Sequence, residues 1–179
     1  MIQNIIWMRV VASVLFIFFG PSVAAELLIF DEDREGWEAA ANHDFTTLTF
    51  LEVPVGTFVT SQYADEGIRF TSIVGTFESG GFPNDGVGLG DLPGEGIAFE
   101  FSQPMTALAF DHPGSVRVRL FAGSSLVGET AFFNGGSGFF GGIVSDVSFD
   151  RVILDSPFPD DDSIAIDDLH FGPSIPAPA

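Results

Sequence analysis

The sequence predicts an all-β domain, an antiparallel β-sandwich or jelly roll of about ten strands with one short helix near its N-terminus. Short β-rich runs follow one another from residue 46 onward, and Gly, Pro, Asn and Asp separate them. Several of these runs alternate apolar and polar residues, the period-2 pattern of a half-buried strand. No helical pattern lies between the runs, which favours an antiparallel arrangement over a parallel α/β sheet.

The helix is predicted over Asp31–Ala41. Asp31 or Asp33 can cap its start, acidic residues crowd its first turn, and Ala39, Ala40 and Ala41 favour its continuation. The opening of this segment also resembles a calcium loop, with oxygen ligands at alternate positions and a glycine at the sixth. Its twelfth position, however, is Asn42 where such a loop needs a bidentate acid, so we interpret it as a helix start.

The strands show the period-2 pattern most clearly in two runs. Within Gly96–Phe101 the apolar residues alternate with Ala98 and Glu100, and within Ser115–Phe121 they alternate with Arg117 and Arg119, which we expect to face water. We assign Phe132, Phe133, Phe139 and Phe140 to the core. The full set of predicted strands is Thr46–Leu51, Gly67–Ser72, Gly96–Phe101, Thr106–Asp111, Ser115–Phe121, Leu126–Phe133, Phe139–Val144, Phe149–Leu154 and Ile164–Phe171.

Gly75–Gly96 is the irregular part of the domain. Its glycines and prolines, together with Asn84, Asp85 and Asp91, predict a long surface loop. Long loops in compact domains are often functional, but a plain connection remains an equal alternative.

Three segments are predicted along the chain. Residues 1–25 form a secretory signal peptide: Arg9 precedes an apolar run over Val10–Gly20, and Val23-Ala24-Ala25 provides small residues for cleavage before Glu26. Residues 26–172 form the β-sandwich domain, and residues 173–179 a proline-rich tail. We therefore expect a secreted or cell-surface protein of bacterial, extracytoplasmic location, with no membrane association after cleavage.

Charge and cysteine content narrow the possible functions. All 25 acidic residues lie after the signal peptide and face only five arginines, so the mature chain carries a net charge of −20; lysine and cysteine are absent. Such a charge repels phosphate backbones and anionic lipids, so we expect no nucleic-acid partner. Without cysteine there are no disulfides and no thiolate metal sites.

A calcium site is predicted near the C-terminus, where Asp160, Asp161 and Asp162 precede an irregular strand. The apolar phase of that strand slips at Asp167 and Asp168, as a β-bulge would cause. An aspartate turned inward there would need a cation or several hydrogen-bond donors. The candidate ligands are Asp167, Asp168 and Glu52, and hard carboxylate oxygens favour calcium. The alternative is a frayed edge with both aspartates in solvent.

No catalytic constellation is evident. His43, His112 and His170 share no metal-ligand spacing, and nucleophile elbows, phosphate loops and zinc-protease motifs are absent. Paired carboxylates for glycan hydrolysis remain an alternative, although no pair stands out. Trp37 and Tyr63 are the only mature residues of the types common on sugar-binding faces, which weakens a flat polysaccharide platform.

Two stretches resemble a known group of secreted bacterial proteins. They are Thr49–Thr57, continuing through Gln62-Tyr63 to Gly67–Phe70, and Phe139–Ile143 with Ser145-Asp146, followed by Ile166–Gly172. The chain resembles the passenger domains of PEP-CTERM proteins, which are sorted by a C-terminal Pro-Glu-Pro signal. The resemblance implies a jelly-roll or lectin-like domain, and a structural calcium at Asp167 or Asp168. Here Pro176-Ala177-Pro178 stands in place of Pro-Glu-Pro, without the hydrophobic helix and arginines that complete the signal, so no anchor is predicted.

These observations predict a secreted, non-catalytic binding module of the cell surface or extracellular matrix. Its expected partner is an extracellular polysaccharide or a surface protein. The alternatives are an extracellular glycan hydrolase and a purely structural matrix protein.

Overall fold

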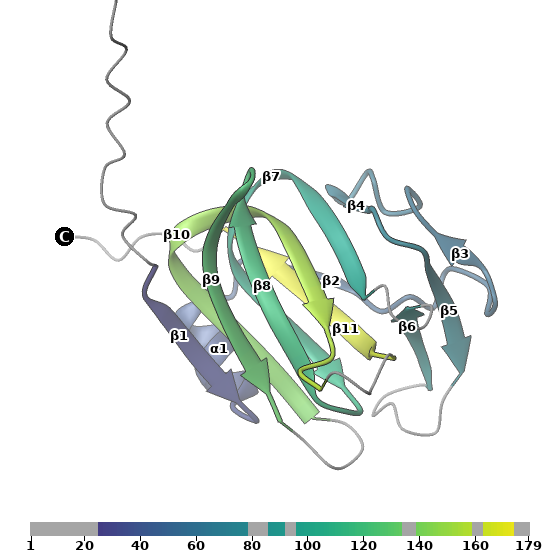
Figure 1. The fold of residues 1–179 in the computed structure, drawn as a ribbon, viewed down its shortest axis with the longest axis horizontal. Helices are drawn as coiled ribbons and strands as arrows, with labels where there is room; N and C mark the ends of the chain where they lie inside the picture. Colours follow the sequence, from purple (N-terminus) through teal and green to yellow (C-terminus); the bar gives the residue numbers. More distant parts are fainter. Residues whose placement is uncertain (1–24, 79–85, 92–95, 134–138, 159–162, 174–179) are drawn as a thin grey trace, which may run out of the picture.

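The computed structural model describes residues 25–78, 86–91, 96–133, 139–158 and 163–173, which form an antiparallel β-sandwich with one helix (Figure 1). The predicted fold class is confirmed. In chain order the elements are β1 (Leu27–Asp31), α1 (Arg34–Ala40), β2 (Thr46–Leu48), β3 (Phe58–Val59), β4 (Ile68–Phe70), β5 (Val74–Glu78), β6 (Val87–Asp91), β7 (Ile97–His112), β8 (Val116–Ala122), β9 (Ser125–Phe132), β10 (Phe139–Asp155) and β11 (Ala165–Gly172).

Two long strands, β7 and β10, run through both walls of the sandwich. In the first wall, the first half of β10 lies between β1 and the second half of β7, and β11 and β2 extend this wall. In the second wall, the second half of β10 lies between β8 and the first half of β7; β9 and β4 form its edges. A register shift between Val144 and Phe149 marks the bend of β10.

The sequence predicted each of these long strands as two short ones. Short stretches rich in polar residues or proline separate the predicted halves, Ser102-Gln103-Pro104 in β7 and Ser145-Asp146 in β10, and such residues are typical of turns. In the structure the backbone stays extended through both stretches while the register shifts. The bend is therefore made by irregular pairing within continuous strands.

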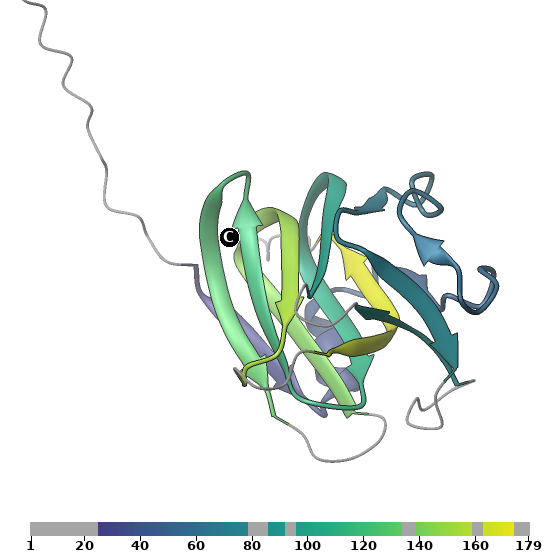
Figure 2. The same cartoon turned by 45° about the vertical axis from the view of Figure 1, so that its right-hand side comes forward.

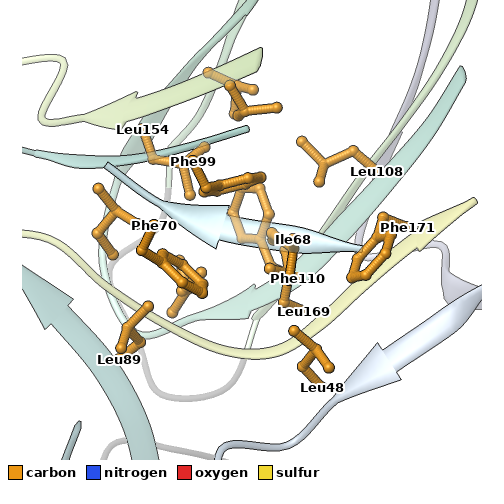
Figure 3. Close-up of a cluster of buried hydrophobic side chains, with 14 of the residues drawn as sticks. Leu48, Ile68, Phe70, Leu89, Phe99, Leu108, Phe110, Leu154, Leu169 and Phe171 are labelled. Atoms are coloured by element: carbon orange, nitrogen blue, oxygen red, sulfur yellow. The ribbon is translucent and has the colours of Figure 1, made fainter. Parts of the chain in front are cut away.

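The core lies between the two walls and is rich in phenylalanine. Ring centroids of Phe99 and Phe101 are 5.5 Å apart, and those of Phe101 and Phe171 are 4.9 Å apart. Figure 3 shows labelled side chains of this cluster, among them Leu48, Phe70 and Phe99, gathered between strands that are far apart in the sequence. The predicted inward positions of β7 and β8 are confirmed, because their alternating apolar residues are buried.

Helix α1 covers the outer face of the first wall. Trp37 is fully buried there against Ala107 and Ala109, and its indole Nε1 donates to the carbonyl oxygen of Ile143 over 3.1 Å. Asp33 caps the helix, since its Oδ1 accepts the backbone N–H of Gly36 at 2.9 Å. The acidic segment from Asp31 is therefore the start of a helix, as predicted. The helix itself begins at Arg34, later than predicted, because Asp31 still pairs in β1.

A smaller side sheet consists of β3, β5, β6 and the first residues of β11 (Figure 2). The prediction of one long loop over Gly75–Gly96 was therefore wrong in part, because β5 and β6 pair as a hairpin from Val74 to Asp91. Glycines, which are depleted in strands, suggested a loop. In the structure the ring of Phe77 lies over Gly90, in space that a side chain would fill.

Some predictions need a further correction, or lie outside the described residues. Phe133 is 63% exposed and does not belong to the core, because β9 ends at Phe132. Phe139 is only half-buried, and Phe140 packs with Trp37 under α1 instead of between the walls. Residues 1–24, 79–85, 92–95, 134–138, 159–162 and 174–179 are not described. They include nearly all of the predicted signal peptide, Asn84, Asp85, Asp160–Asp162 and nearly all of the proline-rich tail.

A substitution at Gly142 would test how tightly α1 packs on the first wall. A Cβ at this position would lie 2.7 Å from the Trp37 ring and 2.9 Å from the Phe140 ring. We predict that Gly142→Ala lowers the free energy of unfolding by about 1–3 kcal/mol, because the well-packed helix must move. Gly75→Ala is the matched control, since its Cβ would meet nothing closer than 3.6 Å. Urea unfolding measures both, and equal stability of the two variants would contradict the prediction.

Candidate functional site

The predicted β-bulge lies at Asp167 and Asp168. β11 pairs with β7 through Asp167 and Asp111 and again through His170 and Ala109, with a register shift between the two pairs. Asp168 has a φ of 44°, the left-handed conformation that turns the chain at this point. As a result Asp167 is fully buried, Asp168 is only half-buried, and Asp167 Oδ1 accepts the backbone N–H of Asp168 at 2.8 Å.

A partly buried polar network lies next to this bulge, at the first turn of helix α1. Arg34 donates through Nη2 to Asp111 Oδ1 at 2.6 Å and through Nη1 to His170 Nε2 at 2.8 Å. Because a guanidinium only donates, His170 Nε2 must accept, and its Nδ1–H then donates to Thr47 Oγ1 at 2.8 Å. His170 is therefore held as the neutral imidazole.

Burial dominates the ionisation of this network. Burial lowers the pKa of His170 to about 4, and the adjacent Arg34 charge lowers that pKa further. Burial raises the pKa of Asp111 to about 6; Arg34 opposes this rise and the carboxylate of Asp168 adds to it. Arg34 thus places a positive charge beside the aspartates, which is the role that the sequence assigned to a bound cation.

The structure brings two of the three predicted calcium ligands together. Asp167 and Asp168 are neighbours, but exposed Glu52 lies between β2 and β3, where its carboxylate adds to burial in raising the pKa of Tyr63. Over the described ranges no group of three or more His, Asp or Glu side chains is placed to hold a metal ion. Calcium binding remains a prediction.

The three histidines lie in different environments. His43 is exposed, whereas His112 is buried between the rings of Phe110 and Phe132. Burial lowers the pKa of His112, whose Nδ1 bonds to the carbonyl oxygen of Gly114. His170 belongs to the network below α1. The two buried histidines thus belong to strands of the first wall and lie in separate environments.

A pocket of about 570 Å³ opens on the side sheet. Strand register places Phe58 opposite Gly75, Gly75 opposite Gly90, and Gly90 opposite Ala165. This row crosses four strands, and apart from the Phe58 ring and the Ala165 methyl group it carries no side chain. Phe77 lies across Gly90, and the turn over residues 113–116 borders the pocket. We call this pocket the trough; its defining residues are Phe58, Gly75, Phe77, Gly90 and Ala165.

Polar groups at the trough are few. Asp91 links the start of β7 to the start of β11, because its Oδ2 accepts the N–H of Gly96 and its Oδ1 accepts the N–H of Ile164, both at 2.9 Å. Ser115 and Ser163 add hydroxyls. Asp91 is the sole carboxylate among the described lining residues. Sequence reasoning found the glycines and Asp91 of this region, but Phe58 joins them only through strand pairing.

Comparisons with known proteins give no assignment. No protein-family model, curated protein or solved structure matches the chain. Among the described residues, no helix has the length and apolar character needed to cross a membrane.

His170 tests the network. Its pKa is lower in the folded state (about 4) than the usual 6.5, so the unfolded chain binds the proton more tightly. We predict that the wild type loses stability relative to His170→Gln as pH falls from 6.5 to 4, by up to about 3 kcal/mol. Urea unfolding at several pH values measures the difference. A constant difference across this range would show that His170 is not held neutral.

Proposed function

We propose that this protein is a secreted, non-catalytic binding module of the bacterial cell surface or extracellular matrix, and that the trough is its ligand site. The single observation that carries the proposal is the trough itself: a concave, largely apolar surface with a few polar groups at its rim, as ligand sites usually are. The signal-like residues 1–25 and the resemblance to PEP-CTERM passenger domains support the secreted location.

The chemistry of the trough favours an extended, uncharged glycan. The row from Phe58 to Ala165 crosses four strands, a span of roughly 14 Å, which suits a short length of chain lying across the sheet. The Phe58 and Phe77 rings can cover the apolar faces of sugars, and Ser115 and Ser163 can bond their hydroxyls. A net charge of −20 opposes acidic glycans.

Two alternative functions, glycan hydrolysis and a purely structural role, must be distinguished from glycan binding. A glycan hydrolase needs two suitably spaced carboxyl groups, whereas the described lining of the trough offers Asp91, which already bonds to two backbone N–H groups. A purely structural matrix protein would need no ligand. The mature protein should be incubated with a panel of neutral and acidic polysaccharides, followed by assays of retention and of reducing ends.

We predict retention on at least one neutral polysaccharide without release of reducing ends. Gly75→Val should abolish retention while preserving the fold, because the added side chain enters the trough and its Cβ meets no atom closer than 3.6 Å. Phe58→Ala should weaken retention about tenfold or more, as expected for loss of a stacking ring. Phe133→Ala is the matched control, since Phe58 and Phe133 are 61% and 63% exposed.

Each contrary outcome has a distinct meaning. Release of sugar would favour the hydrolase, and no retention on any polysaccharide would favour the structural protein. Retention that survives Gly75→Val would place the ligand elsewhere on the surface.

We further propose that calcium stabilises the domain at Asp167 and Asp168. An ion that binds the folded state alone adds about 2.7 kcal/mol when its concentration is a hundred times its Kd. Millimolar calcium should raise the melting temperature, and Asp168→Ala should remove most of that rise. Magnesium at equal concentration controls for general screening of so acidic a chain. Equal effects of the two ions, unchanged by Asp168→Ala, would rule the site out.

A further inference from the structure

The arginines of the mature chain are confined to two places. Of the five that follow the signal peptide, Arg34 is engaged in the network below α1. The other four, Arg69, Arg117, Arg119 and Arg151, all lie on the second wall, in β4, β8 and β10. Since lysine is absent, this wall holds every remaining side-chain cation apart from histidine.

Strand register places these arginines on one face. One cross-strand row runs from Arg69 through Glu100 to Arg151 and on to Phe121. The next row contains Arg119, and the one after it Arg117. Residues of opposite parity, such as Val118, Leu120 and Val152, are buried in the core, so the four arginines stand on the outer face of the second wall. We call this surface the arginine face.

The arginine face combines charge with apolar area. Asp155 accepts from Arg117 Nε at 2.7 Å and also pairs with Arg119, while the guanidinium of Arg151 lies 4.3 Å from the centre of the Phe121 ring. Leu126, opposite Phe121, is 51% exposed. Four acids (Glu100, Glu129, Asp150 and Asp155) balance the four arginines, so this face is close to neutral while the mature chain as a whole carries −20. Arginine and aromatic residues are enriched in protein interfaces.

The complementary charge lies on the other side of the same molecule. Helix α1 covers the outer face of the first wall, and Asp31, Asp33, Glu35 and Asp44 are exposed around it. The core separates this acidic end from the arginine face. In Figure 1, β8 and β9 lie in front and α1 lies behind them.

We propose that a second copy of this chain docks its α1 end onto the arginine face. The fit rests on charge: exposed carboxylates on one copy meet arginine side chains on the next, which can bind a carboxylate through two parallel hydrogen bonds. Because the two surfaces differ and lie on opposite sides, the contact is head-to-tail. Each copy leaves one arginine face and one acidic end open, so association builds an open chain of molecules.

The salt dependence of association distinguishes this contact from nonspecific clustering. Copies with a net charge of −20 repel one another, and added salt weakens that repulsion. Ion pairing between local surfaces predicts the opposite dependence. Sedimentation velocity of the mature protein in EDTA, over a concentration series, should show association at about 50 mM salt and less of it at about 500 mM. Monomers at every concentration, or association that strengthens with salt, would overturn the proposal.

Paired variants test the two surfaces. Arg69→Glu with Arg119→Gln alters the arginine face and leaves the Arg117–Asp155 ion pair in place. Glu35→Lys with Asp44→Lys alters the acidic end. Each pair should weaken self-association about tenfold or more. Glu78→Lys, at an exposed acid that ends β5 in the side sheet, changes the net charge in the same direction as the acidic-end pair and should not weaken association.

Mixing provides the decisive measurement. The arginine-face variant keeps its acidic end, and the acidic-end variant keeps its arginine face, so together they should form a one-to-one complex that cannot extend. Recovery of this complex also shows that both variants are folded. No complex on mixing, with melting temperatures close to that of the wild type, would overturn the head-to-tail contact.

Discussion

The pairing of β7 with β10 holds the molecule together. The two strands pair in one register from Phe139 to Val144 and in another from Arg151 to Leu154, so they contribute to both walls. Every other strand of the walls pairs with one of these two or extends a strand that does. Since the register shifts between the two halves, each strand turns its apolar face toward the same core on both sides of the bend. The core, the surface on which α1 packs, and the outer faces of the walls all depend on this register shift.

A second constraint acts where β11 crosses from the first wall to the side sheet. The bulge at Asp168 lets Ile166 and Leu169 both reach the core, although they are three positions apart and would face opposite sides of a regular strand. It also buries Asp167 close to Asp111, and two carboxyl groups in such a place are unstable without positive charge. Arg34 supplies that charge from the first turn of α1, and in doing so it fastens the helix to the wall. Packing at Trp37 and ionic contact at Arg34 therefore hold the same helix.

The three surfaces that remain outside this framework have different characters. The trough on the side sheet is apolar and lies over glycines, the end near α1 is acidic, and the second wall carries the arginines. Binding at the trough leaves both charged surfaces open. The proposed ligand site and the proposed contact between copies therefore use different surfaces of the domain.

The sequence alone determined the fold class, the inward positions of β7 and β8, the capped start of the helix and the bulge at Asp167. Each of these depends on local periodicity or on neighbouring residues, which a sequence displays directly. It did not show that β7 and β10 are continuous, that β5 and β6 form a hairpin, or that Phe133 is exposed. Continuity and exposure depend on which strands lie alongside. Only the tertiary structure placed Arg34 beside Asp111, Phe58 beside Gly75 and four arginines on one face, because these contacts join residues that are distant in the chain.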